Sequence, residues 1–257
     1  MLKLENIQMS FNKGTVDEMT LFQDFNFHVN KGDFISIVGS NGSGKTTLLN
    51  LICGTLQPDG GKIELLGSDI TKWPEHKRAK QIGRVFQDPK MGTCSNLTVL
   101  ENFALADNKN KAYTLGAAIS KKRIDHYRQL LHQCDMGLED RMNTPIGNLS
   151  GGQRQAIALV IAGMTKVDLL ILDEHTAALD PKSSETVMAL TDKLVKENGL
   201  TAVMVTHNLR FAVDYGNRLV MMHSGNAIID KSGAEKQVLT VADLLGTFNE
   251  ISIECGN

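Results

Sequence analysis

Eight consecutive residues carry the clearest chemical signal in the sequence. They are Gly39, Ser40, Asn41, Gly42, Ser43, Gly44, Lys45 and Thr46. The run fits Gly-x-x-x-x-Gly-Lys-Ser/Thr in full, after an apolar stretch at 34–38 and before an apolar helical pattern. Its glycines let backbone N–H groups surround a polyphosphate, and the helix adds its positive N-terminal end. We expect Lys45 to reach the terminal phosphates and the Thr46 hydroxyl to bind Mg²⁺. The pattern therefore predicts a nucleoside triphosphate site.

Two acidic residues follow a second apolar run, Leu169–Leu172. Asp173 ends that run and can hold a water of Mg²⁺, which requires near-octahedral oxygen ligands. Alternation along a strand would turn the next side chain, Glu174, away from Asp173. A carboxylate that faces the γ-phosphate can deprotonate the attacking water, a role worth roughly 10²–10⁴ in rate. Two acids after a strand are more often a solvated loop, but the phosphate loop in the same chain favours the catalytic interpretation.

A second anion site is predicted at Leu149-Ser150-Gly151-Gly152-Gln153. Ser150 supplies a hydroxyl, Gly151 and Gly152 leave their N–H groups unobstructed, and Ala156–Met164 continues as a helix. The alternative interpretation is an ordinary helix N-terminus. Two phosphate-binding helix starts in one chain make that alternative less attractive.

The bulk properties exclude several classes of protein. Lys and Arg total 27 against 29 Asp and Glu, whereas a general nucleic-acid binder usually has a basic excess. The four cysteines, Cys53, Cys94, Cys134 and Cys255, form no Cys-x-x-Cys pair, which argues against a zinc site and fits a reducing cytosol. We expect no secretory signal. The longest strongly apolar stretch, Ala156–Met164, is too short to span a bilayer, so any spanning is expected of another chain.

The elements that must position these residues follow an α/β pattern with an interruption. Apolar residues alternate along 1–11 and 21–29, and buried strands are expected at 34–38, 167–172 and 200–206. Between about 88 and 160 the pattern is mostly helical. Within it, Thr98 and Glu101 have the spacing of a capping box.

Taken together, these motifs resemble an ATP-binding-cassette (ABC) ATPase subunit over essentially the whole chain, 1–257. The run 149–153 matches the family signature, which is far more specific than the phosphate loop. The resemblance implies a single α/β domain: a RecA-like phosphate-loop NTPase core, with an N-terminal antiparallel β-subdomain and an inserted α-helical subdomain. The core would comprise 1–87 and 161–257, and the inserted subdomain 88–160.

The resemblance also assigns roles to residues outside the two anion sites. Gln87 takes the place of the Q-loop glutamine and is expected to serve both catalysis and Mg²⁺ binding. Asp180 ends a D-loop-like run and is expected at the nucleotide. His207 resembles the switch histidine that contacts the γ-phosphate, although a lone histidine after a buried strand is normally structural. Phe11 takes the place of the aromatic residue that stacks on adenine. The choice of ATP is implied by the family, because stacking tolerates any base.

A head-to-tail homodimer with two ATP molecules is a further implication of the resemblance. Each ATP would lie between two segments from different chains. One is Gly39–Thr47, in which Thr47 directly follows the phosphate loop, and the other is Ser150–Gln153 of the partner chain. The closed dimer would depend on ATP because the γ-phosphate bridges both chains, and hydrolysis would release it.

The chain departs from the family pattern at two places. His175-Thr176 follows Glu174 where most members have Pro-Thr, and the signature is followed by Arg154-Gln155-Ala156, where a second arginine is usual. The run 174–180, with the runs around His207 and Asn217, resembles a bacterial importer subgroup. Its members act beside a lipoprotein-type solute-binding protein, and some are linked to aromatic amino acids. Integral membrane permease subunits are therefore expected partners, contacted around Gln87–Leu97, and the chain is expected at the cytoplasmic face of the membrane.

Two alternatives remain. The first is an ABC ATPase of the cell-division or cluster-assembly type, which moves no solute. The second is a phosphate-loop kinase or GTPase, which would leave Leu149–Gln153 without a role.

Overall fold

The computed structural model describes residues 1–109, 119–165 and 167–254. Cys255 and the part of the predicted helical insertion at 110–118 lie outside these residues. The chain divides into two compact units, one formed by Met1–Trp73 with Ala202–Asn257 and the other by Pro74–Thr201. The predicted limits of the inserted subdomain, 88 and 160, stay a prediction. Among the described residues, no helix is both long enough and apolar enough to cross a membrane.

The first unit begins with an antiparallel sheet. Its strand order is β2-β1-β4-β5, and the strands are β1 (Leu2–Phe11), β2 (Met19–Val29), β4 (Gly60–Leu65) and β5 (Ser68–Asp69). Alternate residues of β1 are buried because one face of the sheet is covered, as the alternating sequence predicts. The predicted N-terminal antiparallel β-subdomain is therefore confirmed.

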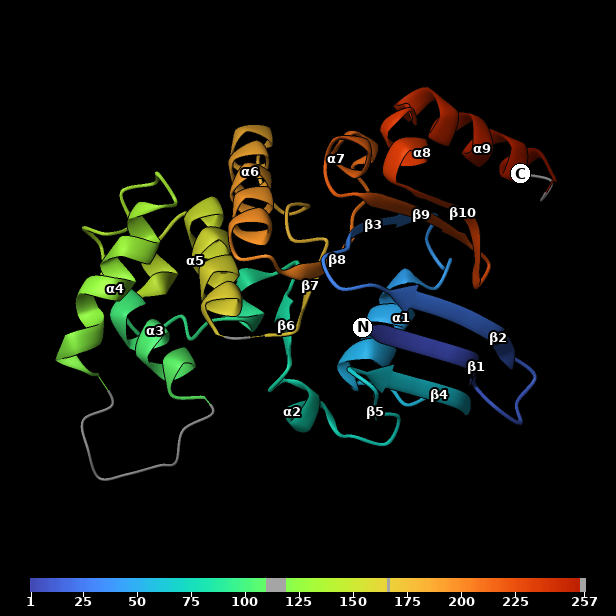
Figure 1. The fold of residues 1–257 in the computed structure, drawn as a ribbon, viewed down its shortest axis with the longest axis horizontal. Coiled ribbons are helices and arrows are strands. Elements are labelled where there is room, and N and C mark those ends of the chain that lie inside the picture. Colours follow the sequence, from blue (N-terminus) through green and yellow to red (C-terminus); the bar gives the residue numbers. More distant parts are fainter. Residues whose placement is uncertain (110–118, 166, 255–257) are drawn as a thin grey trace. The chain divides into compact units, whose positions relative to one another are not determined.

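The second sheet of this unit carries the phosphate loop. In it, β3 (Phe34–Gly39) runs parallel to β8 (Thr201–Val205) and β9 (Arg218–His223), and β9 pairs with antiparallel β10 (Asn226–Ser232). All six residues of β3 are buried, as expected for a parallel strand covered on both faces. The helices α7 (Leu209–Asp214), α8 (Gly233–Gln237) and α9 (Val241–Glu254) gather on one side of these strands (Figure 1). Apolar side chains of α7 and α9 share a core with β3 and β9 through Val38, Ala212, Leu219, Met221 and Leu244.

The helix that follows the phosphate loop is shorter than its apolar pattern suggests. The pattern continues to Leu56, but α1 spans Lys45–Cys53. Gly54 ends it in the left-handed conformation, with φ 84°, and donates its N–H to the Asn50 carbonyl. A glycine in this conformation is a common helix end, because it meets no Cβ penalty there.

The second unit is mostly helical. Within its described residues, the strands β6 (Ile82–Val85) and β7 (Leu169–Asp173) are parallel. Its helical elements are α2 (Glu75–Arg78), η1 (Pro89–Met91), α3 (Val99–Asp107), α4 (Lys121–His132), η2 (Ile146–Asn148), α5 (Gly151–Met164) and α6 (Pro181–Glu197). Helix α5 packs against α3, α4 and α6 (Figure 1). The capping box predicted at Thr98 and Glu101 opens α3, so that helix start is confirmed.

Candidate functional site

The predicted phosphate-binding residues form a tight loop between β3 and α1. Gly42 and Gly44 adopt φ values of 77° and 105°, a region that glycine enters without steric cost. The Ser43 N–H donates to the Ser40 carbonyl at 3.2 Å, and the first helical bond joins Leu48 N–H to the Gly44 carbonyl at 2.8 Å. The glycines therefore curl the chain as the sequence predicts.

The polar groups of this loop suit an anion. The Lys45 side chain is buried, and its Nζ donates to the Gly39 and Ser40 carbonyls, both at 2.8 Å. The Ser43 hydroxyl is buried and has no hydrogen-bond partner within the part of the chain that the structure describes. Thr46 is exposed in the first turn of α1. A buried cation, an orphaned hydroxyl and a helix N-terminus at one loop fit a polyphosphate.

The phosphate loop packs against three residues that were not predicted from the sequence: Phe22, Met222 and Gly225. A Cβ built on Gly44 would lie 3.0 Å from the Phe22 ring, and one built on Gly39 would lie 2.3 Å from the Met222 carbonyl oxygen. The Gly225 N–H, in the turn between β9 and β10, donates to the Ser43 carbonyl at 3.1 Å. The turn at 224–226 is visible in the sequence, but its contact with the loop depends on tertiary structure.

His207 and Phe11 also belong to the first unit. Ile37 pairs with Val205 in the parallel register of β3 and β8, and the Thr206 N–H donates to the Ile37 carbonyl at 3.1 Å. His207 is therefore next to the strand end from which the phosphate loop starts, and it is exposed. Phe11 is half-buried at the end of β1. Its stacking on adenine stays a prediction.

Asp173 ends β7, as predicted. It also has an ion-pair partner that was not predicted. Its Oδ2 accepts from Arg84 Nη2 at 2.7 Å, with the two side chains 15% and 13% exposed. The Arg84 guanidinium also lies over the Phe86 ring, 4.7 Å from the ring centre. This ion pair involves only Oδ2 of Asp173. The other carboxylate oxygen, Oδ1, is of the type that Mg²⁺ prefers as a ligand.

Glu174 differs from the expected strand alternation. Strand β7 ends at Asp173, and Glu174 adopts the left-handed conformation with φ 48°. Its carbonyl accepts from Ala177 N–H at 2.9 Å. The direction of this half-buried side chain is thus set by a turn, and the strand period does not apply to it.

The residues after Glu174 are fixed to α6. His175 is 1% exposed, and its Nε2 lies 3.0 Å from Thr191 Oγ1. Burial, which disfavours the charged ring, lowers the pKa of His175 from its ordinary value of 6.5 to about 4, so the ring is neutral at pH 7. Asp180 Oδ1 accepts from the Ser183 N–H at 3.1 Å and caps α6, and hydrogen bonds from Ser183 lower the pKa of Asp180. Pro181 follows at the first helical position, where the missing N–H of proline costs no helical hydrogen bond.

The signature residues form a capping box at the start of α5. Ser150 Oγ accepts from the Gln153 N–H at 3.3 Å, and Gln153 Oε1 accepts from the Ser150 N–H at 3.2 Å. Gly151 is half-buried. Gly152 is buried, and a Cβ there would lie 3.0 Å from Ser183. Close packing of α5 on α6 is thus a second reason for glycine at 152.

Gln87 lies two residues beyond the end of β6, in the segment that leads to η1. The preceding carbonyl, that of Phe86, accepts from the buried Gln155 Nε2 at 3.0 Å. Gln155 lies on α5, so this hydrogen bond ties the Gln87 segment to that helix. Gln87 itself is exposed.

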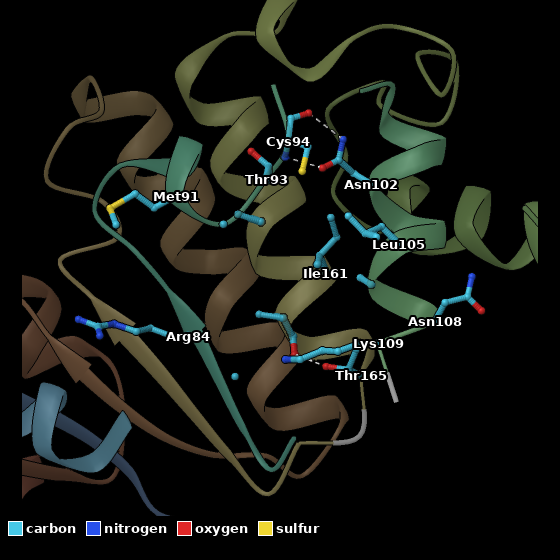
Figure 2. Close-up of a pocket in the computed structure, with 15 residues that line it drawn as sticks. Arg84, Met91, Thr93, Cys94, Asn102, Leu105, Asn108, Lys109, Ile161 and Thr165 are labelled. Atoms are coloured by element: carbon cyan, nitrogen blue, oxygen red, sulfur yellow. Dashed lines mark hydrogen bonds between the residues drawn. The ribbon is translucent and has the colours of Figure 1, made fainter. Parts of the chain in front are cut away.

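A pocket of about 470 Å³ lies beside this segment, wholly within the second unit. Figure 2 shows Met91, Cys94, Leu105 and Ile161 among its lining side chains. Met91 and Leu105 are 69% and 57% exposed. The buried Asn102 accepts from the Cys94 N–H at 2.7 Å and donates to the Cys94 carbonyl at 3.1 Å, which fixes the loop at its rim.

Comparison with known proteins decides the family. A family model described as ABC transporter matches residues 22–177. The chain belongs to the ABC transporter family. It is an ATPase and binds ATP, so the alternative of a phosphate-loop kinase or GTPase is wrong.

Relatives of this ABC ATPase include transport proteins. A tyrosine transport ATP-binding protein of Clostridioides difficile is 42% identical, over 96% of this chain and 98% of the relative. The spermidine/putrescine import ATP-binding protein PotA of Spiroplasma citri is 33% identical, over 98% of this chain and 68% of the relative.

Solved structures of cassettes share the fold. The structure of cbiO1 from Clostridium perfringens, part of the ABC transporter complex cbiONQ, has a TM-score of 0.76 and 28% identity, and covers 99% of this chain and 96% of that one. A dimeric ATP-binding cassette in a post-hydrolysis state, bound to ADP and Pi, has a TM-score of 0.75 and 29% identity, and covers 90% of this chain and 98% of that one. The predicted fold class, a phosphate-loop α/β core, is confirmed.

Proposed function

We propose that the chain is the ATP-hydrolysing subunit of a bacterial importer, in which ATP-driven dimer closure powers solute uptake through separate membrane subunits. The observation that carries this proposal is that one chain has two helix starts whose groups suit a phosphate. The phosphate loop with Lys45 belongs to the first unit, and the capped helix start at Ser150 belongs to the second. Each is half of a nucleotide site, and a second copy of the chain completes it.

The chemistry follows from the groups at these places. Water attacks the γ-phosphorus, Glu174 takes a proton from that water, and the bond between the γ-phosphorus and the bridging oxygen breaks to release ADP. His207 contacts the γ-phosphate, and Gln87 serves catalysis next to it. Asp180 lies at the nucleotide, at the dimer interface. Phe11 stacks on adenine, which needs only an aromatic face.

Mg²⁺ fits the donor set of this chain. The Thr46 hydroxyl, the Gln87 amide oxygen and an Asp173 carboxylate oxygen are the hard oxygen ligands that Mg²⁺ prefers. When bound, Mg²⁺ neutralises charge that develops on the phosphate oxygens. Arg84 holds the other Asp173 oxygen at 2.7 Å and so orients the carboxylate.

Dimer closure is supported by a solved relative. That relative is a dimeric cassette bound to ADP and Pi. In the present chain the Ser150 capping box presents the N-terminus of α5, a positive end that suits a γ-phosphate from the partner subunit.

The pocket between η1, α3 and α5 is the proposed docking place of a membrane subunit. Its floor is formed by small and apolar residues of α5, Ala158, Ile161 and Ala162. Met91 and Leu105 expose apolar surface at its rim, which suits a short amphipathic helix. Leu97, expected at this surface from the sequence, is half-buried and lies outside the pocket lining.

For the solute we propose an amino acid, with aromatic amino acids first. The support is the relative named as a tyrosine transport ATP-binding protein, which matches nearly the full length of both chains. A lipoprotein-type solute-binding protein would deliver the solute, and the cassette would lie at the cytoplasmic face of the membrane.

The ATPase proposal is tested with Glu174→Gln. This variant should bind ATP and form a stable dimer with it, while its turnover falls by at least about 10², because the general base is lost. Size-exclusion chromatography with and without ATP measures the dimer. Turnover close to that of the unmodified chain would remove Glu174 from the role of base.

The import proposal is tested with the complete transporter. The chain is co-expressed with its membrane subunits, reconstituted in vesicles, and supplied with tyrosine, phenylalanine, tryptophan, methionine and spermidine in turn. Stimulated ATP hydrolysis and uptake with the aromatic amino acids are expected. Failure to co-purify with any membrane subunit would favour a cell-division or cluster-assembly ATPase.

A further inference from the structure

His175 forms a directional contact with the buried face of α6. Its Nε2 lies 3.0 Å from Thr191 Oγ1, and both residues are at most 1% exposed. The Thr191 hydroxyl also lies 2.8 Å from the Val187 carbonyl. A carbonyl can only accept, so the single hydroxyl hydrogen is donated to Val187. His175 Nε2 must therefore carry a hydrogen and donate it to Thr191.

The backbone of Glu174 must be held in place by the residues that follow it. A non-glycine residue at φ 48° costs of order 1–2 kcal/mol and persists only where the surrounding structure holds it. On the N-terminal side, β7 fixes Asp173. On the other side, the Thr176 carbonyl accepts from Ser184 Oγ at 3.0 Å, two residues away from Glu174. The His175 contact with Thr191 is one residue closer.

Helix α6 provides a rigid reference for both contacts. Ser184 and Thr191 are seven residues apart, which places them on the same face two turns from each other. Both are buried. The turn after Glu174 is thus tied to α6 at two points, by two directional hydrogen bonds.

We propose that His175 is a positioning residue: through its Nε2–H donor to Thr191 it holds the left-handed turn that aims the Glu174 carboxylate. The proposal rests on the proposed role of Glu174 as general base. A space-filling histidine could be replaced by any apolar side chain of similar size. A directional donor could not, and a displacement of about 1 Å at a catalytic group can cost on the order of 10²-fold in rate.

The test compares variants that break the contact with variants that keep it. His175→Leu and Thr191→Val remove the donor and the acceptor, whereas His175→Gln and Thr191→Ser retain a donor and a hydroxyl. We expect the first pair to lose about tenfold in kcat, with KM for ATP within about twofold, and the second pair to recover most of kcat. Thr186→Val is the matched control, because it removes the same kind of hydroxyl bond, to Lys182 at 3.0 Å, from the same helix.

Two further measurements separate this inference from the role of Glu174 and from misfolding. In the Glu174→Gln background, His175→Leu should cause no further loss, because the group that it positions is absent. Circular dichroism and ATP binding verify that each variant is folded. If His175→Leu does not fold, the comparison of Thr191→Val with Thr191→Ser tests the same hydrogen bond. Equal losses in His175→Leu and His175→Gln, or normal kcat in Thr191→Val, would overturn the inference. Normal turnover of Glu174→Gln would instead overturn the base assignment.

Discussion

At the scale of single residues, the protonation of His175 follows from its burial. Its folded-state pKa of about 4 is below the ordinary value of 6.5, so the unfolded chain takes up the proton first as the pH falls. Stability is therefore unaffected at pH 7 and is lost between pH 6.5 and 4, by up to about 3 kcal/mol. Urea unfolding of the unmodified chain and of His175→Gln at pH 7, 6 and 5 measures the difference. Parallel pH profiles of the two chains would contradict this assignment.

The contact between Arg84 and Asp173 makes a second prediction at this scale. Arg84→Met leaves a largely buried carboxylate without its partner, and it should lower the free energy of unfolding by about 3 kcal/mol. The double variant Arg84→Met with Asp173→Asn should recover much of that loss, since no charge is left unpaired. Denaturant unfolding of the four chains completes the cycle. Additive losses would mean that the two side chains are not coupled.

The same pair shows where residue-scale prediction stops. Asp173 could be predicted because it directly follows an apolar run. Arg84 could not, because its meeting with Asp173 depends on the register of β6 against β7, in which Arg84 pairs with Ile171. Register is a tertiary property, and no local pattern near Arg84 reports it.

At the scale of elements, local signals predicted helix starts well. The starts at Thr98 and Ser150 are both side-chain caps in the structure, and both could be predicted because each cap and its partner are within three residues of each other. The turn at Glu174 was missed, since strand alternation was assumed to continue. What holds that turn is α6, which begins seven residues later at Pro181.

Replacement of Gly225 tests whether the turn between β9 and β10 supports the phosphate loop. A Cβ there would lie 1.7 Å from the Leu21 carbonyl oxygen, whereas a Cβ on Gly32 would meet nothing within 4 Å. Their φ values, 78° and 83°, are nearly equal, so both alanine variants carry the same backbone strain of about 1 kcal/mol. Gly225→Ala should add a steric cost of at least about 2 kcal/mol and weaken ATP binding, because the Gly225 N–H supports Ser43.

Thermal unfolding and ATP titration of the two glycine variants measure this difference. Gly32→Ala is the control for strain alone. If both variants unfold at the same temperature and bind ATP equally well, the turn between β9 and β10 is not a support of the loop.

At the scale of the whole molecule, the proposed dimer explains why neither anion site suffices alone. A two-fold dimer has two equivalent sites, each with the loop of one chain and the signature helix of the other. Lys45→Ala removes every functional loop from a homodimer, and Ser150→Arg blocks every signature helix. Each variant alone should therefore be inactive. The loss in Ser150→Arg should exceed that in Ser150→Ala, because the alanine removes the hydroxyl and a cap worth about 1 kcal/mol but leaves the start of α5 open to the phosphate.

Mixing the two inactive variants tests the shared site directly. In a mixed dimer, the intact loop of the Ser150→Arg chain meets the intact signature helix of the Lys45→Ala chain, so one site of two is complete. Equal mixing makes half of the dimers mixed, and ATPase activity should recover to roughly a quarter of that of the unmodified chain. If each chain instead hydrolysed ATP by itself, the mixture would show only the sum of two inactive proteins. Recovery on mixing therefore requires a site that two copies share.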